Sequence, residues 1–125
     1  MHRFLALPLF VALAAASPAA SALNWVPLMK NTPFERFDED DLQMFLENAR
    51  KTLNGAPDKQ TVTWENPDTR HGGDFTVLKT WQKDGLTCRQ LHVRTQADTR
   101  KGNSVVSACQ VKGKWKLIGA PVKQK

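Results

Sequence analysis

Two cysteines, Cys88 and Cys109, carry the most specific chemistry in this 125-residue chain. An even number of cysteines in an exported protein predicts a disulfide bond. The pair is not spaced as C-x-x-C, the arrangement of redox-active dithiols, so we interpret the bond as structural. With both thiols bonded and no serine in a G-x-S-x-G setting, the chain offers no activated nucleophile. We therefore predict no catalytic residues and a protein that is not an enzyme.

Histidine and acidic residues raise the alternative of a metal site. His71 lies close in sequence to Asp68 and Asp74, but a metal site needs three or four converging ligands. A second acidic cluster, residues 38–41, directly precedes an apolar periodic stretch. The start of a helix accounts for all of its acidic residues. We therefore predict no bound metal and no cofactor.

The basic residues indicate binding instead. Lysine and arginine number 18 against 12 aspartates and glutamates, a formal net charge of +6 that favours anionic partners. Candidate binding residues lie in the polar loops and on the last predicted strand: Arg70, His71, Arg94, Arg100, Lys101, Lys114 and Lys116. The simpler alternative is that lysines on an outer strand only deter edge-to-edge aggregation.

The elements that must position these residues begin with a helix, predicted over residues 39–53. Asp38 is placed to cap its first turn. Apolar residues then recur at helical spacing, namely Leu42, Phe45, Leu46, Ala49 and Leu53. Gly55 and Pro57 predict its end.

Five short strands are predicted after this helix, over residues 61–65, 75–83, 87–95, 104–111 and 114–118. Asp84-Gly85 and Lys112-Gly113 predict two-residue turns, and residues 96–103 predict a polar loop. Strands joined in sequence by short turns form an antiparallel meander. The predicted fold class is therefore α+β, an N-terminal helix packed on a five-stranded antiparallel sheet with one disulfide. Which face the helix covers is left open.

The strand register supports a bond between Cys88 and Cys109. The two tight turns set the outer hairpins, and the disulfide sets the middle one. In this register Leu78 faces Leu91. Because side chains alternate between faces, the three hairpins agree in placing one apolar set together: Leu78, Leu91, Val93, Val106, Ala108, Trp115 and Leu117. The opposite face is predicted to hold, beside the disulfide, Trp81, Phe75 and Val77.

The first 22 residues predict a secretory signal peptide. Arg3 precedes an apolar run, and Ala20-Ser21-Ala22 suits a signal peptidase. The apolar run is shorter than the roughly 20 residues that span a bilayer. We expect a single domain over residues 23–125, periplasmic or secreted, with no transmembrane segment and with outer-membrane association left open. Nucleic acid is not an expected partner in that compartment, and the oligomeric state is left open.

Five sequence motifs resemble the rickettsial seventeen-kilodalton surface antigen family. Its W-x-N-P-x-T turn is similar to residues 64–69, which read Trp64-Glu65-Asn66-Pro67-Asp68-Thr69. Further matches follow in the family's order and spacing: Gly72-Gly73, Cys88-Arg89-Gln90, Ala108-Cys109-Gln110 and Gly113-Lys114-Trp115. The resemblance covers about residues 60–118. It implies a bacterial envelope protein and carries over no enzymatic activity. The family's lipidated cysteine and glycine-rich membrane segment are not matched, which favours a periplasmic or secreted form.

The leading functional hypothesis is a non-enzymatic envelope protein that binds an envelope protein or an anionic envelope component. Its basic loops or a sheet face left uncovered would make the contact. The alternative is a periplasmic inhibitor or immunity-type protein that blocks a hydrolase, because a loop of a small disulfide-bonded domain can plug an active site.

Overall fold

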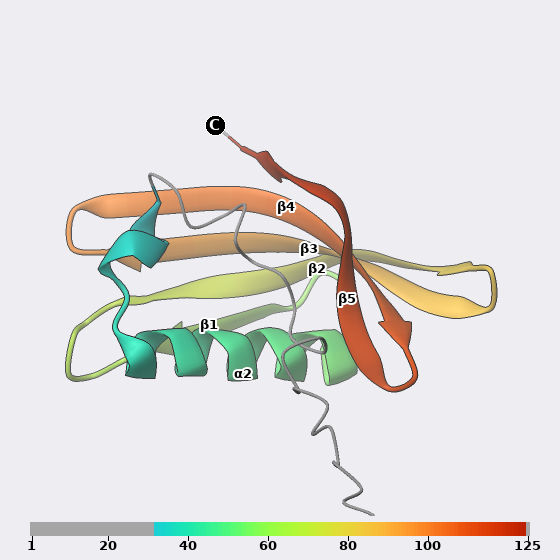
Figure 1. The fold of residues 1–125 in the computed structure, drawn as a ribbon, viewed down its shortest axis with the longest axis horizontal. Helices are drawn as coiled ribbons and strands as arrows, with labels where there is room; N and C mark the ends of the chain where they lie inside the picture. The colour runs from blue at the N-terminus through green and yellow to red at the C-terminus, as the bar shows by residue number, and fades with distance from the viewer. Residues whose placement is uncertain (1–31, 125) are drawn as a thin grey trace, which may run out of the picture.

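The computed structural model describes residues 32–124 of the protein (Figure 1). A 3-10 helix, η2 (Pro33–Arg36), precedes the α-helix α2 (Glu39–Gly55), and five strands follow: β1 (Thr61–Glu65), β2 (Gly72–Lys83), β3 (Leu86–Ala97), β4 (Arg100–Val111) and β5 (Lys114–Lys123). Each strand pairs antiparallel with its neighbour in sequence. The predicted α+β fold is confirmed. The predicted signal peptide, residues 1–22, lies outside the described residues.

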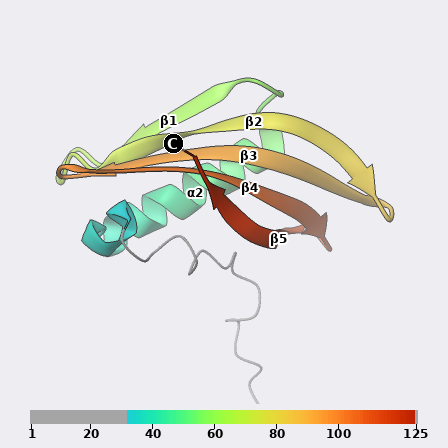
Figure 2. The same ribbon diagram turned by 90° about the horizontal axis from the view of Figure 1, so that it is seen from above.

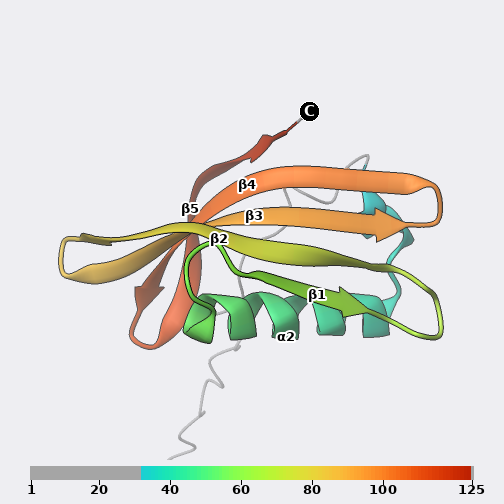
Figure 3. The same ribbon diagram turned by 180° about the vertical axis from the view of Figure 1, so that it is seen from behind.

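The sheet has one covered face and one open face. Figure 2 shows α2 and η2 on the same side of the sheet. There α2 contacts β1 and β2, while η2 contacts β3 and β4. Figure 3 shows the opposite side, over which no helix of residues 32–124 lies; we call it the open face. Within the described range, no helix has the length and apolar character needed to cross a bilayer.

The helix α2 begins where the sequence predicts and ends two residues later. The Asp38 carboxylate accepts a hydrogen bond from the Asp41 N–H at 2.8 Å, and the Asp41 carboxylate accepts one from the Asp38 N–H at 3.0 Å. This reciprocal capping box satisfies two N–H groups that a helix start leaves unpaired. Gly55 is the last helical residue, and the Ala56 N–H donates to the Thr52 carbonyl.

The buried face of α2 is rotated from the predicted one. Residues that point into the protein are Asp41, Phe45, Ala49, Thr52 and Leu53. The predicted core residues Leu42 and Leu46 are only partly buried. Because adjacent helix positions lie about 100° apart around the axis, a stripe that starts at residue 41 turns residues 42 and 46 toward its edge. A carboxylate thereby enters the core.

The strands are longer than predicted, chiefly at the turn between β3 and β4. The polar segment 96–103, predicted as a loop, is strand except for a turn at Asp98 and Thr99. Its buried residues alternate with exposed ones, since Thr95 and Ala97 face inward and Gln96 faces outward. The polar side chains therefore belong to an open sheet face and do not indicate a loop. Strand β5 likewise continues beyond the predicted end at residue 118.

Most of the predicted register is confirmed. The observed pairs include Lys83–Leu86, Trp81–Cys88, Cys88–Cys109, Leu91–Val106, Val111–Lys114 and Ala108–Leu117. The pairing of Leu78 with Leu91 is wrong, because a bulge between Val77 and Lys79 brings Val77 opposite Leu91. One extra residue inverts the faces of the strand beyond it. Phe75 and Val77 are consequently buried on the covered face, against prediction, and Leu78 is only partly buried.

The core between α2 and the sheet is aromatic at one end and aliphatic along its centre. Phe45 is fully buried and makes edge or tilted ring contacts with Phe34, Trp64 and Phe75. Leu91 and the other inward residues of the central strands complete it, namely Val77, Val93, Val106, Ala108 and Trp115. Burial of this apolar surface holds the helix on the sheet.

Candidate functional site

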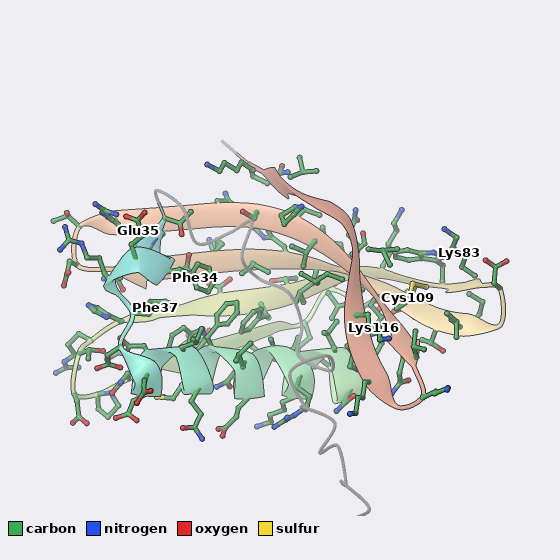
Figure 4. The ribbon with its side chains drawn as sticks, viewed as in Figure 1. Phe34, Glu35, Phe37, Lys83, Cys109 and Lys116 are labelled. Carbon is green, nitrogen blue, oxygen red and sulfur yellow. A yellow bond between two sulfur atoms is a disulfide. The ribbon has the colours of Figure 1, made fainter. Side chains whose placement is uncertain are left out.

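The meander places successive turns at opposite ends of the sheet (Figure 1). At one end lie the β1–β2 and β3–β4 turns, η2 and the start of α2; we call this the histidine end, after His71. At the other lie the β2–β3 and β4–β5 turns and the end of α2; we call this the disulfide end, after Cys88–Cys109. Figure 4 shows Phe34, Glu35 and Phe37 at the first end, and Lys83, Cys109 and Lys116 at the second. The predicted binding residues are therefore divided between two separate regions.

At the histidine end, three predicted binding arginines are held in ion pairs. Arg70 contacts Glu65 at 3.0 Å and Arg100 contacts Glu35 at 2.6 Å. Arg94 donates to the Asp74 carboxylate through two nitrogens, and the shortest contact is 2.7 Å. Asp74 thereby raises the pKa of the Arg94 guanidinium. A charge that is already neutralised adds little attraction for a ligand.

Lys101 lies beside Arg94 on the open face. Both residues line a shallow groove of about 560 Å³, which also contacts Asp74 and Asn103. The groove is lined by amide and hydroxyl groups and by the Arg94–Asp74 ion pair. Lys101 is its one cation that no ion pair of residues 32–124 engages, and a single cation makes the groove a weaker candidate for an anion than a cluster of lysines.

His71, predicted as an exposed binding residue, is instead buried between two carboxylates. Its Nδ1 lies 2.8 Å from Asp41 Oδ2 and its Nε2 lies 3.0 Å from Asp98 Oδ1. The ring stacks on Phe37 with centroids 5.9 Å apart. Hydrogen bonding to Asp98 raises the pKa of His71; burial opposes this shift and Asp41 reinforces it. A doubly protonated imidazolium fits this site, which joins the helix to the β3–β4 turn.

Asp41 is the centre of this network and was missed as a site residue by sequence analysis. Its Oδ1 accepts bonds from Asn66 Nδ2 at 2.8 Å and Thr69 Oγ1 at 2.7 Å. Burial opposes ionisation, but the bonds from Thr69, the Asp38 N–H, His71 and Asn66 together lower the pKa of Asp41. Asp41 precedes Phe45 by four residues, and this helical spacing was the signal that Asp41 lies on the buried face of α2.

The W-x-N-P-x-T turn now has a structural role. Asn66 and Thr69 both donate to Asp41, and Thr69 also accepts the His71 N–H at 3.2 Å. Asn66 orders the turn itself by accepting the Asp68 N–H at 3.0 Å. These residues therefore hold the start of α2.

At the disulfide end, Arg89 fastens the other end of α2. Its guanidinium donates to the backbone carbonyls of Thr52, Leu53 and Ala56 at the helix end and contacts Asp58 at 3.2 Å. The Thr52 carbonyl also accepts the Ala56 N–H. Positive charge at a helix C-terminus is favourable. The arginine of the C-R-Q motif is thus a structural residue that sequence analysis did not identify.

Trp115 adds a second anchor for the same helix end. Its indole Nε1 donates to Asn54 Oδ1 at 2.7 Å, and its ring is buried. A cleft of about 330 Å³ lies between α2 and the sheet here and is lined by both Arg89 and Trp115. Both polar groups have partners within the protein, so we interpret them as structural residues.

The predicted disulfide is present and lies on the open face. Cys88 and Cys109 are directly paired, with Cα atoms 4.0 Å apart and both side chains buried. Trp81 pairs with Cys88, and Lys116 pairs with Cys109. A single row across four strands therefore reads Trp81, Cys88, Cys109 and Lys116, with the sulfur atoms at its centre.

Lysines surround this row. We call Lys79, Lys83, Lys112, Lys114 and Lys116 the lysine patch. The residues that carry it, 79–88 and 109–118, hold these five lysines and a single acid, Asp84. Lys83, Lys114 and Lys116 are exposed. Among residues 32–124, no ion pair engages a lysine of the patch, and Lys79 lies 5.3 Å from the centre of the Trp81 ring. Sequence analysis identified Lys114 and Lys116 and missed Lys79 and Lys83, because only the hairpin brings them together.

Metal chemistry finds no support at either end. Over residues 32–124, no group of three or more histidine, cysteine, aspartate and glutamate side chains is arranged to hold an ion. His92, the second described histidine, bonds through Nε2 to the Asn103 side chain on the open face.

Comparisons with known proteins match the part of the chain that includes the strands. The family model for the 17 kDa outer membrane surface antigen matches residues 51–116. A 17 kDa surface antigen of Rickettsia bellii strain RML369-C is 26% identical over 83 residues, which cover 65% of this chain and 52% of that protein. A second 17 kDa surface antigen of Rickettsia bellii matches with the same figures. The chain thus spans about half the length of these relatives. No solved structure matches it.

Proposed function

This chain belongs to the 17 kDa outer membrane surface antigen family, and from that premise we propose that it is an exported, non-enzymatic protein of the cell envelope. In this proposal it binds an anionic envelope component through the lysine patch at the disulfide end. The histidine end serves to hold the fold.

The observation that carries the proposal is the different state of the charges at the two ends. Arg70, Arg94 and Arg100 each have a carboxylate partner. The lysine patch has five ammonium groups and one nearby acid, Asp84. Clustered charges that lack internal partners produce an outward field that attracts the opposite charge and accelerates association.

A non-enzymatic role is supported by the state of the reactive groups. Both cysteines are bonded to each other. Both nitrogens of His71 face carboxylates, and His92 Nε2 is bonded to Asn103. Catalysis by these groups would require one of them to have a free, correctly placed lone pair or proton.

The test compares two triple variants in pull-down experiments from bacterial envelope extract. K83Q/K114Q/K116Q removes three patch charges, and K51Q/K59Q/K123Q removes three equally exposed charges elsewhere. The protein is recovered after export from a bacterial host, and its N-terminus is read by mass spectrometry. We expect the first variant to lose capture of anionic material and the second to keep it.

Two outcomes would overturn the proposal. Equal capture by both variants would mean that the lysine patch is not the binding surface. One-to-one capture of a hydrolase that survives high salt and the loss of the patch lysines would favour the alternative, an inhibitor. Salt dependence separates these cases, because exposed charges are screened over a Debye length of about 10 Å at 0.1 M salt.

A further inference from the structure

We infer that the occupant of the lysine patch is the headgroup layer of an anionic phospholipid bilayer. This inference rests on the proposed function and names the partner of the same surface. Three features of the patch favour a membrane over a protein: the apolar residues within it, its place at a projecting end of the sheet, and the use of lysine in place of arginine.

Apolar side chains lie within the ring of lysines. Trp81, Leu86 and Val111 are half-buried, and Ile118 is 36% exposed. The register places them close to the disulfide, since Trp81 pairs with Cys88, Leu86 with Lys83, and Val111 with Lys114. An apolar centre with cationic edges matches the boundary between acyl chains and headgroup phosphates. Lysine stems can lie along such a surface while their ammonium groups reach the phosphates.

The position of the patch suits a broad, flat partner. In Figures 1 and 3 the β2–β3 hairpin extends beyond the end of α2. Figure 4 shows Lys83 and Lys116 with Cys109 at this end of the molecule. The disulfide joins β3 to β4 there, so that both hairpins present their charges on one stapled unit.

The residue types of the lysine patch favour a lipid partner over a protein partner. Protein interfaces are depleted in lysine and use arginine, tyrosine and tryptophan as anchors in pockets. Residues 79–88 and 109–118 contain five lysines and no arginine. Tryptophan anchors protein interfaces and membrane–water interfaces alike, so the lysine content without arginine carries the distinction. Trp81, with Lys79 over its ring at 5.3 Å, has the composition of such an anchor.

Vesicle sedimentation tests the inference directly. The exported protein is mixed with vesicles of equal parts phosphatidylglycerol and phosphatidylcholine, or of phosphatidylcholine alone. Each lysine near an anionic surface contributes about fivefold in binding, so K83Q/K114Q/K116Q should lower binding to the anionic vesicles on the order of a hundredfold. The control K51Q/K59Q/K123Q should change it by much less. Binding should vanish for the neutral vesicles and in high salt.

Tryptophan fluorescence supplies a readout of contact at the patch itself. Trp64 and Trp115 are buried, Trp81 is partly buried, and Trp25 lies outside the described residues, so the measurement is made in a W25F background. Anionic vesicles should shift the emission to shorter wavelength, and the shift should be absent in W81F. A shift that persists in W81F would place the contact elsewhere and overturn the inference.

The inference and the proposed function fail in different ways. Loss of envelope capture in K83Q/K114Q/K116Q, with no wild-type binding to anionic vesicles, would keep the patch as the binding surface and identify an acidic protein or glycan as its partner. Vesicle binding that is equal in both triple variants would reject the patch altogether.

Discussion

The histidine end and the disulfide end of the sheet are stabilised by different chemistry. Each must hold one end of α2 and one pair of strand turns. The histidine end does so with charges, through Asp41, His71 and Asp98. The disulfide end does so with a covalent bond and with Arg89 against backbone carbonyls. Charges used inside the fold are unavailable to a ligand, whereas the disulfide leaves the nearby lysines free.

The comparison also separates what holds the fold from what contacts a partner. Arg89 and Arg94, each with a fork of donors, hold carbonyls or a carboxylate in fixed geometry. Lysine, a flexible point charge, is found where nothing in residues 32–124 pairs with it. Substitutions at the two ends should therefore have opposite effects, on stability at one and on binding at the other.

The largest effect is expected from removal of the buried acid. Asp41→Ala should lower the free energy of unfolding by about 3–5 kcal/mol, because it removes the acceptor of the buried His71 Nδ1 and Asn66 and of the partly buried Thr69. Urea denaturation measures this. The exposed neighbour Asp40→Ala is the matched control and should cost less than about 1 kcal/mol. Equal losses would show that the network adds nothing beyond a helix-end charge.

Removal of the disulfide should come next. The double variant Cys88→Ala/Cys109→Ala should lose about 3 kcal/mol, as expected for a closed loop of roughly twenty residues. Its denaturation curve should be unaffected by reductant, whereas the wild-type curve should move toward it. A wild-type protein that is unchanged by complete reduction would contradict a stabilising role for the bond.

Arg89→Met should cost about 2 kcal/mol. The substitution keeps the apolar stem but removes the donor to the Leu53 and Ala56 carbonyls and one of the two donors to the Thr52 carbonyl. Loss of protection of the last turn of α2 in hydrogen exchange, with the first turn unchanged, would locate the effect. A uniform loss along the helix would mean that Arg89 supports the sheet more than the helix end.

The pH dependence of stability tests the histidine end on a smaller scale. The pKa of His71 is raised above its ordinary value of 6.5, so its contribution is complete below pH 6.5 and is lost as the pH rises through the folded pKa. The pKa of Asp41 is lowered below 3.8, so its contribution is complete above pH 3.8 and is lost as the pH falls through the folded pKa. Taken together, the two groups give greatest stability between these values.

Denaturation across this range provides the measurement. The free energy of unfolding should fall as the pH rises above 6.5 in the wild-type protein, and His71→Gln should flatten that slope. An unchanged slope in His71→Gln would assign the pH dependence to other groups.

The smallest effect on stability is expected at the lysine patch. K83Q/K114Q/K116Q should change the free energy of unfolding by less than about 0.5 kcal/mol, because exposed residues without partners contribute little. The same variant should lose anionic binding. A large loss of stability would contradict the assignment of binding to the disulfide end and of stability to the histidine end.

Sequence reasoning reached the fold through local rules. The capping residue Asp38, the turn at Asp84-Gly85 and the alternation of strand residues are local signals, and each is confirmed by the structure. Sequence reasoning failed where one extra residue changed the register between β2 and β3. The bulge at Leu78 moved Phe75 and Val77 to the other face, and no local signal at that position announced it.

The candidate site was predicted only in part for the same reason. The sequence identified Arg70, His71, Arg94 and Arg100 by charge and loop position, but their partners are distant in the chain. His71 meets Asp41 across 30 residues, and Arg100 meets Glu35 across 65. Charge alone does not tell a free cation from a paired one.

By itself, then, the sequence determined the helix start, the five-stranded meander, the pairing of Cys88 with Cys109 and the family, because each depends on short-range spacing or on ordered motifs. Only the tertiary structure decided which face α2 covers and which charges remain free. Those outcomes depend on contacts between residues far apart in the chain. The buried Asp41 carboxylate gains four hydrogen bonds, whereas no ion pair within residues 32–124 engages exposed lysines such as Lys83 and Lys116.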